Sequence, residues 1–362
     1  MRIVHVVLAL NVGGLECMLI DICRKQALKA NVSLIVVNDS YDRGLLNCVK
    51  NDVPCVLIKR PPGSRNPWHL LRLLRALLRL DPDIIHLHQL SLISLIRLLP
   101  FPRITTVHLA LREPQPPVVA REYLCGISGA VGETIKRVYP RAVCAIVANG
   151  VDFSRIAARN KSPDGPFNLL QVSRLDHSVK GQDLLLRAIA VLRDRYAKDN
   201  LTVTFVGRGS SLEYLQSLAR ELGVARQCLY MGEKPREWLY QNISSYDLLV
   251  QPSRQEGFGL AIVEAMAARV PVLVSDLAAP MEIIQAGRFG YYFSCGSADD
   301  CADRIQQALS EIRKPSYASR LEAAYAYAQS HFDVARTVDR YFEEYKNVLK
   351  TYKARSRRRV RI

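Results

Sequence analysis

The sequence lacks three patterns that assign many chains to a class at once. No apolar run approaches the roughly 18 residues of a membrane span, so no transmembrane helix is expected. The nine cysteines include no C-x-x-C pair, which argues against a zinc site or a disulfide framework and favours free thiols in a reducing compartment. Gly13 and Gly14 follow the first apolar run but form no G-x-G-x-x-G, so a nicotinamide cofactor is not indicated.

Composition is that of a globular chain, with 49% hydrophobic and 23% charged residues in 362. At roughly 150 residues per domain, this length predicts two domains. The net charge of +16 is uneven: residues 1–149 hold 19 basic and 10 acidic residues, residues 150–349 hold 24 of each, and the last 13 hold seven basic and none acidic. A uniformly basic nucleic-acid binder is therefore disfavoured, and contact with an anionic partner along one face is favoured.

Short apolar runs alternate with segments of helical period along the chain. This alternation predicts parallel sheets wrapped by helices, in two sets joined by a Pro/Gly-rich linker at 161–166. The expected strands are 3–10, 33–37, 84–87, 104–107, 144–147, 168–172, 202–206, 247–250 and 272–275, and the expected helices are 15–28, 68–80, 181–196, 211–222, 260–268, 299–312 and 334–349. Ligands of such domains bind at the carboxyl ends of strands and in the cleft between paired domains.

Three segments that follow expected strands have residues suited to anions. Gly13 and Gly14 open a helix, where backbone N–H groups attract negative charge, although a plain tight turn is equally consistent. Arg174 and Lys180 supply two cations after one strand, which can hold a diphosphate or remain solvated loop charges. The third segment, 252–267, carries the most information.

The strand expected at 247–250 runs into segment 252–267, which predicts a glycine-rich loop and then a helix of good helix formers. The amides near the helix start favour phosphate, and two carboxylates lie beside them, Glu256 on the loop and Glu264 just over one turn into the helix. Carboxylates beside an anion site make physical sense when they accept hydrogen bonds from hydroxyl groups, which sugars provide. The loop and helix-start residues are Gly257, Phe258, Gly259 and Leu260.

Glu256 and Glu264, with seven residues between them, match the E-x7-E signature, and the sequence here resembles the retaining glycosyltransferases of family 4, which have the GT-B fold. The resemblance extends over nearly the whole chain. Motifs in the family's order include Gly13–Glu16, Asp83–His86, Thr106–His108, Ile127–Ser128, Asn149–Asp152, Ser173–Leu175, Lys180–Gly181, Val206–Gly209 and Pro271–Val272.

The resemblance implies two Rossmann-like domains facing a central cleft. An acceptor-side domain is expected at 1–160 and a nucleotide-sugar-binding domain at 161–333, with the helix 334–349 returning to the first domain and a basic tail at 350–362. Arg174 and Lys180 would hold the donor diphosphate, and Glu256 with Gly257, Phe258, Gly259 and Leu260 would contact the donor sugar. Glu264 would bind the ribose hydroxyls, Gly13 and Gly14 would shape the phosphate side of the cleft, and His108 would lie beside the sugar.

The sequence departs from the family pattern at three positions. Ser173 precedes Arg174 where Gly is usual, Leu109 follows His108 where Asp is common, and Arg269 replaces a Gly after the E-x7-E helix, where an exposed cap is expected. None of the three removes a charged donor ligand, so the resemblance implies an active enzyme. It would transfer a hexose-type sugar from a nucleotide donor, with UDP favoured, to a glycan or glycolipid, as in cell-surface polysaccharide or lipopolysaccharide biosynthesis.

No metal or other cofactor is expected. Asp81 and Asp83 form a D-x-D triplet, but it precedes a strand and favours a turn over a metal site. His86 and His88 share a strand face without an evident third ligand, so core or cleft-rim histidines are favoured over metal ligands. The diphosphate charge would be met by Arg174, Lys180 and the helix start.

The segment 67–80 combines Trp68 and several leucines with Arg72, Arg75 and Arg79 at helical spacing. Such a basic amphipathic helix can lie on an anionic membrane, or it can be a packing helix with a solvated arginine stripe. Together with the basic tail it favours a cytoplasmic protein held peripherally at the inner face of the plasma membrane. A nucleotide-sugar epimerase of the same fold, and a non-catalytic protein that binds anionic lipid or nucleic acid, are the alternative functions.

Overall fold

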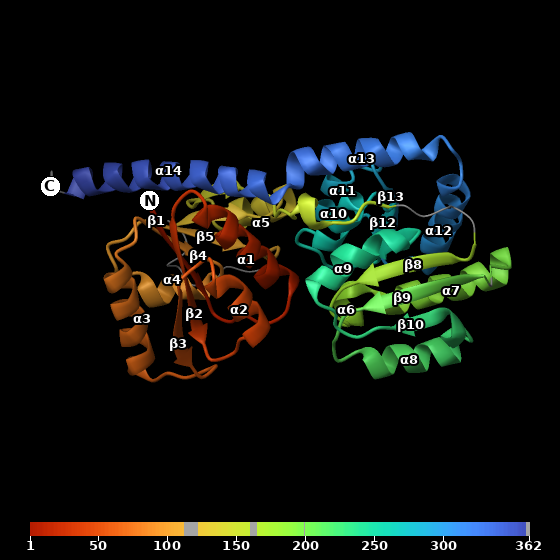
Figure 1. The fold of residues 1–362 in the computed structure, drawn as a ribbon, viewed down its shortest axis with the longest axis horizontal. Coiled ribbons are helices and arrows are strands. Elements are labelled where there is room, and N and C mark those ends of the chain that lie inside the picture. The colour runs from red at the N-terminus through yellow and green to blue at the C-terminus, as the bar shows by residue number, and fades with distance from the viewer. Residues whose placement is uncertain (112–121, 160–164, 199, 360–362) are drawn as a thin grey trace. The chain divides into compact units, whose positions relative to one another are not determined.

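The computed structural model describes residues 1–111, 122–159, 165–198 and 200–359, with side chains described up to residue 353. Two compact units form: Met1–Gly150 with Val334–Ile362, and Val151–Asp333. Each contains one parallel sheet with helices around it, which confirms the predicted fold class of two doubly wound, Rossmann-like domains (Figure 1).

The first unit has a seven-stranded sheet in the order β3-β2-β1-β4-β5-β6-β7, parallel throughout. Its strands are β1 (Arg2–Val7), β2 (Asn31–Asn38), β3 (Cys55–Arg60), β4 (Ile84–Leu87), β5 (Arg103–Val107), β6 (Tyr123–Gly126) and β7 (Val143–Ile146). Its helices are α1 (Gly14–Ala27), α2 (Arg43–Lys50), α3 (Pro67–Leu80), α4 (Ser91–Ile96), α5 (Gly129–Val138) and α14 (Val334–Arg359). The central strands are short apolar runs, as buried parallel strands require.

The second unit has a six-stranded parallel sheet in the order β10-β9-β8-β11-β12-β13. Its strands are β8 (Phe167–Val172), β9 (Leu201–Val206), β10 (Cys228–Tyr230), β11 (Leu248–Gln251), β12 (Val272–Ser275) and β13 (Tyr291–Phe293). Its helices are α6 (His177–Lys180), α7 (Gln182–Tyr196), α8 (Leu212–Glu221), α9 (Arg236–Asn242), α10 (Leu260–Ala267), α11 (Ala278–Ile283), α12 (Ala298–Ile312) and α13 (Tyr317–Phe332). The strand order reverses between β8 and β11, which is where doubly wound sheets bind ligands.

The units divide at Gly150, ten residues before the domain boundary expected at 160. The cause is local packing. Val151 forms a bridge with Asp333 and donates its N–H to the carbonyl of Phe332 at 2.9 Å. Phe153 packs edge-on against Tyr325, with the ring centroids 5.8 Å apart. These contacts attach the start of the connecting segment to the second unit, and most of the expected linker 161–166 lies outside the described residues.

The helix α14 belongs to the first unit, where it packs on α1 and β5 (Figure 1, dark blue). Its side chains Tyr341 and Tyr345 are fully buried there. The helix continues ten residues past Leu349, so the basic tail expected from residue 350 is a continuation of α14 as far as Arg359. The physical reason is that this stretch contains no Gly or Pro and is rich in Lys and Arg, which favour helix.

Arg269 caps the C-terminus of α10, as expected, but its side chain is not exposed as expected and is bound to α13. Its backbone lies in the left-handed region at φ 59°, a conformation that is strained for a residue with a side chain. The Arg269 guanidinium donates to Glu322 and lies 3.8 Å from the ring centroid of Tyr325. These two contacts offset the strain that a glycine would have avoided. Among the described residues, no helix is both long and apolar enough to cross a membrane.

Candidate functional site

Two loops at the carboxyl edge of the second unit's sheet are packed together. One follows β8 and contains α6, and the other joins β11 to α10. Arg254 and Gln255 both donate their backbone N–H to the carbonyl of Val179, at 2.8 and 3.2 Å. Gly181 lies at φ +66°, and a Cβ there would collide with the carbonyl oxygen of Pro252. A glycine at this position therefore allows the two loops to meet.

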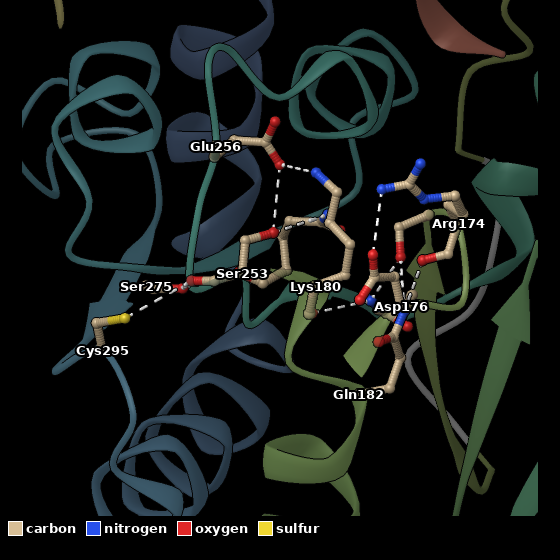
Figure 2. A network of polar contacts seen from close by, with 11 residues as sticks. Arg174, Asp176, Lys180, Gln182, Ser253, Glu256, Ser275 and Cys295 are labelled. Carbon is tan, nitrogen blue, oxygen red and sulfur yellow. Dashed lines mark hydrogen bonds and ion pairs between the residues drawn. The ribbon is translucent and has the colours of Figure 1, made fainter. Parts of the chain in front are cut away.

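Lys180 and Glu256 are brought together by this packing, although 76 residues separate them in the sequence. The Lys180 ammonium donates to Glu256 Oε2 at 2.7 Å, and both side chains are largely buried. The Ser253 hydroxyl donates to the same oxygen at 3.2 Å, and Ser275 holds the Ser253 carbonyl at 2.6 Å (Figure 2). A cation and a carboxylate thus stand side by side, each held by its own loop.

Arg174 lies beside this pair but is much less constrained. Its side chain is 68% exposed and pairs with Asp176 at 3.2 Å, while its backbone carbonyl accepts from the Gln182 amide at 2.9 Å (Figure 2). Exposed ion pairs of this kind contribute only about 0–1 kcal/mol. The backbone of Arg174 is therefore fixed, and its guanidinium is available to exchange Asp176 for an anionic ligand.

The start of α10 lies next to Glu256. Gly259 caps the helix at φ +115°, and the helix begins at Leu260. Phe258 is buried and packs edge-on against Phe332, so its side chain belongs to the core and leaves only its backbone for the expected contact with the donor. Gly257, Gly259 and Leu260 occupy the loop and helix start expected from the sequence. The positive end of the α10 dipole therefore lies beside Glu256, and it favours a phosphate group there.

Glu264 lies in the second turn of α10 and is only 6% exposed. Its Oε1 is 3.5 Å from Nε of Arg236, the first residue of α9, whose side chain is also largely buried. Arg236 was not predicted, because neither its spacing nor its neighbours form a pattern with Glu264. The described structure thus adds a third cation to the site.

The remaining predicted residues belong to the first unit. Gly13 and Gly14 lie at the start of α1, and Glu16 curls back close to Gly13. Burial raises the pKa of Glu16 above its ordinary value.

His108 directly follows β5, and burial lowers its pKa to about 4, so its imidazole is neutral at pH 7. Its Nε2 has no hydrogen-bond partner among the described residues. Contact of Gly13, Gly14 and His108 with a donor stays a prediction.

A buried histidine network lies beneath His108. His5 and His86 are register partners on β1 and β4, and His88 follows β4. His5 Nδ1 is 3.0 Å from His88 Nε2, and the His88 and His108 rings stack with centroids 5.7 Å apart. His5 Nε2 also bonds to the Gln26 amide oxygen at 2.8 Å. His5 was not predicted to join His86 and His88, because β1 and β4 are far apart in the sequence and become neighbours only through a crossover in the sheet.

His5, His86 and His88 are a group that the described residues offer for a metal ion. Five of their six ring nitrogens already have other partners, and His88 Nδ1 has none among the described residues. His86 Nδ1 is 2.8 Å from the Tyr345 hydroxyl, and its Nε2 is 2.7 Å from that of Thr106. His5 and His88 are bonded to each other. These hydrogen bonds tie α14 to the sheet, and because both nitrogens of His5 and both of His86 are engaged in them, the group fits a metal poorly as it stands.

Asp81 and Asp83 lie at the opposite, amino edge of the first sheet. Arg2 donates to Asp81 at 2.7 Å and to Asp83 at 3.2 Å, and all three side chains are well exposed. Asp81 adopts a left-handed conformation that ends α3. The triplet therefore forms a turn, as the sequence analysis favoured.

Comparison with known proteins places this chain in one family. A family profile described as "Glycosyltransferase Family 4" matches residues 12–155, and one described as "Glycosyl transferases group 1" matches residues 152–325. The chain belongs to the family 4 glycosyltransferases, whose fold is GT-B.

Among curated relatives, the D-inositol 3-phosphate glycosyltransferase of Corynebacterium jeikeium is 34% identical over 139 residues, 37% of this chain and 33% of that protein. The match thus spans about a third of that relative's length. Among solved structures, Anabaena HepE in complex with UDP-glucose aligns with a TM-score of 0.82 at 18% identity, over 96% of this chain and 100% of that one. The lipopolysaccharide outer core galactosyltransferase WaaB aligns with a TM-score of 0.70 at 19% identity, over 98% and 100%. At these identities the two structures support the fold alone.

Proposed function

We propose that this protein is a retaining glycosyltransferase that moves a hexose-type sugar from a nucleotide donor, UDP-linked in the first instance, to a glycan or a lipid-linked acceptor. The observation that carries the proposal is the Lys180–Glu256 pair beside the start of α10. A diphosphate needs cations and helix amides, a sugar needs carboxylate acceptors, and the second unit provides both within one edge of its sheet. Anabaena HepE, which binds UDP-glucose, has the same fold.

Each residue of the site has a separate role in the proposed sugar transfer. Arg174, Lys180 and the start of α10 stabilise the charge that develops on the departing diphosphate. Glu256 turns from Lys180 toward a sugar hydroxyl when the diphosphate engages the lysine, and Glu264 accepts hydrogen bonds from ribose. The acceptor hydroxyl attacks on the face from which the diphosphate leaves, and a diphosphate oxygen takes its proton. Because protein cations meet the diphosphate charge, the reaction needs no metal ion.

The test is to incubate the protein with UDP-, GDP- and ADP-linked sugars and a panel of glycan and glycolipid acceptors, and to follow anomeric protons by NMR. We expect an α-linked product from an α-linked donor, at a rate that EDTA does not change. A β-linked product contradicts retention, and release of a free epimer without acceptor indicates the epimerase. Absence of nucleotide binding supports a non-catalytic binding protein.

The acceptor is proposed to be anionic and membrane-bound, a lipopolysaccharide core being the first choice, and α3 supports this. Its buried face is formed by Leu73 and Leu77. The other face exposes apolar side chains, with Trp68 at 63% and Leu78 at 56%, beside three exposed arginines, Arg72, Arg75 and Arg79. Trp68 and the arginines recur at helical spacing and share one face. Such a surface suits the headgroup region of an anionic bilayer at the inner face of the plasma membrane.

We expect the protein to bind vesicles that contain anionic lipid, to ignore neutral vesicles and to be largely released by high salt. Each basic side chain contributes about 1 kcal/mol at an anionic surface, and salt screens it beyond roughly 8–10 Å. Reversing Arg72, Arg75 and Arg79 to Glu should lower vesicle flotation and activity on a lipid acceptor, with nucleotide affinity unchanged.

The matched control reverses three exposed arginines of the second unit, Arg187, Arg220 and Arg226, which changes the net charge equally. This control should retain most vesicle binding. Binding that is indifferent to lipid charge, or an equal loss in both triple variants, contradicts a membrane surface on α3. Arg72, Arg75 and Arg79 would then be ordinary solvent-exposed residues of a packing helix.

A further inference from the structure

We propose that Arg236 is a positioning residue for nucleotide recognition: it holds the Glu264 carboxylate ionised and oriented, so that the site selects nucleotides with a complete ribose. The inference rests on the proposed function, in which Glu264 accepts from the ribose hydroxyls. It adds a residue on a different helix, α9, that no sequence pattern links to Glu264.

Arg236 and Glu264 form a buried ion pair. Nε of Arg236 lies 3.5 Å from Oε1 of Glu264, and the two side chains are only 10% and 7% exposed. Removing an ionised carboxylate from water is unfavourable unless a charge or hydrogen bonds compensate. Arginine is protonated at every relevant pH, so Arg236 supplies that compensation permanently. The carboxylate therefore stays in its acceptor form.

The acceptor form decides what Glu264 can bind. An ionised carboxylate only accepts hydrogen bonds, through two oxygens with about four lone-pair positions, so it can accept from more than one hydroxyl group at once. The 2′- and 3′-hydroxyls of ribose are two such donors on adjacent carbons. A nucleotide that lacks the 2′-hydroxyl removes one donor from a buried charge, which is a strong basis for discrimination.

Arg236 is itself held in place by the ring of Tyr240. It follows Pro235 as the first residue of α9, and its guanidinium carbon lies 4.9 Å from the ring centroid of Tyr240, one turn later. Tyr240 is fully buried, so the ring is a fixed platform. A lysine would retain the charge but not the planar group that stacks on this ring.

Arg155 provides a matched control. Its guanidinium carbon lies 5.4 Å from the same Tyr240 ring, but its ion pair is to Glu237 at 2.6 Å. Arg155→Gln therefore removes a cation from the same aromatic ring without removing the contact to Glu264. Any effect shared by both variants reports on packing of α9, and an effect confined to Arg236 reports on the carboxylate.

The experiment measures binding of UDP and 2′-deoxy-UDP by calorimetry. We expect the wild-type protein to prefer UDP by roughly tenfold or more, the size of a hydrogen bond to a charged group. Arg236→Gln should reduce this preference to within about threefold, Arg236→Lys should lie between the two, and Arg155→Gln should keep the wild-type ratio. The ratio is the decisive readout, because a structural defect lowers affinity for both nucleotides alike.

Glu264→Gln separates failure of this inference from failure of the proposed function. If Glu264→Gln keeps the wild-type ratio, Glu264 is not the ribose ligand, and that part of the proposed function fails. If Glu264→Gln loses the preference and Arg236→Gln keeps it, only the role of Arg236 is overturned.

Two further outcomes are decisive. Should Arg236→Gln not fold, Arg236→Lys decides alone: a ratio below the wild-type value supports the inference, and an unchanged ratio overturns it. If the wild-type protein prefers GDP or ADP to UDP, that nucleotide and its 2′-deoxy form replace the uridine pair, and binding of none of the three overturns both proposals.

Discussion

Replacing Lys180 by Ala is expected to lower kcat by roughly 30- to 1,000-fold, because one preorganised cation at a developing anion is worth about 2–4 kcal/mol. The expectation follows from its position: the ammonium is largely buried 2.7 Å from Glu256, in a turn that Gly181 packs against the next loop. The cation is thus fixed before the reaction, and no side chain needs to reorganise as the diphosphate departs. The measurement is steady-state turnover with the best donor from the nucleotide-sugar panel.

Loss of Lys180 also leaves Glu256 without its cation, so a stability effect must be separated from the kinetic one. Thermal unfolding of Lys180→Ala measures the first, and the exposed Lys314→Ala in the same unit controls for the loss of one positive charge. Near-normal kcat and donor KM in Lys180→Ala would show that Lys180 does not bind the diphosphate. A fall in kcat matched by unfolding at the assay temperature would assign Lys180 a structural role instead.

Acidification from pH 7 to pH 5 is expected to destabilise the first unit selectively. Burial lowers the pKa of His5 and His108 to about 4, and burial with neighbouring histidines lowers those of His86 and His88 well below the ordinary value. Burial also raises the pKa of Tyr345 and Cys23, so these two packed neighbours stay neutral and supply no negative charge to the imidazoles.

The sign follows from proton uptake. Below the unfolded pKa of about 6.5 the unfolded chain binds protons that the folded network excludes, so stability is complete above that pH and is lost as pH falls toward 4. At pH 5 this amounts to about 2 kcal/mol for each of His5 and His108, a large part of the roughly 5–15 kcal/mol stability of a whole domain, and the lowered pKa values of His86 and His88 act in the same direction.

Hydrogen exchange, corrected for its intrinsic pH dependence, distinguishes the units. Amides of β1 and β4 should lose protection between pH 7 and pH 5, while those of β8 and β9 should keep it, because the second unit's two histidines, His177 and His331, are not buried. Equal losses in both units, or full protection of β1 at pH 5, would contradict a neutral network as the cause.

The strand, loop and helix of the E-x7-E segment were located from sequence to within one residue. Expected bounds of 247–250 and 260–268 compare with Leu248–Gln251 and Leu260–Ala267. Two apolar runs separated by Gly257-Phe258-Gly259 leave little freedom for another arrangement. The parallel sheets were equally predictable, because alternation of strands and helices repeats along the chain.

Other elements gave weaker signals. The strands β6, β10 and β13 contain only three or four residues, too few to establish a period, and β3 has only one fully buried residue. Contacts between distant segments were missed for a different reason. Arg236 meets Glu264, and His5 meets His88, only after helices and strands have packed. The order β2-β1-β4, common to doubly wound sheets, was the signal that could have paired His5 with His86.

The first unit is built from two separate stretches of the chain, and this determines the order in which the two units can complete folding during synthesis. The second unit, Val151–Asp333, is one continuous stretch, so all of its contacts are available before the ribosome reaches α14. The first unit begins to emerge earlier, yet its buried Gln26 and His86 find their partner Tyr345 only when α14 has left the exit tunnel. The domain that is synthesised first is therefore the one that finishes folding last, with its histidine core open to solvent in the meantime.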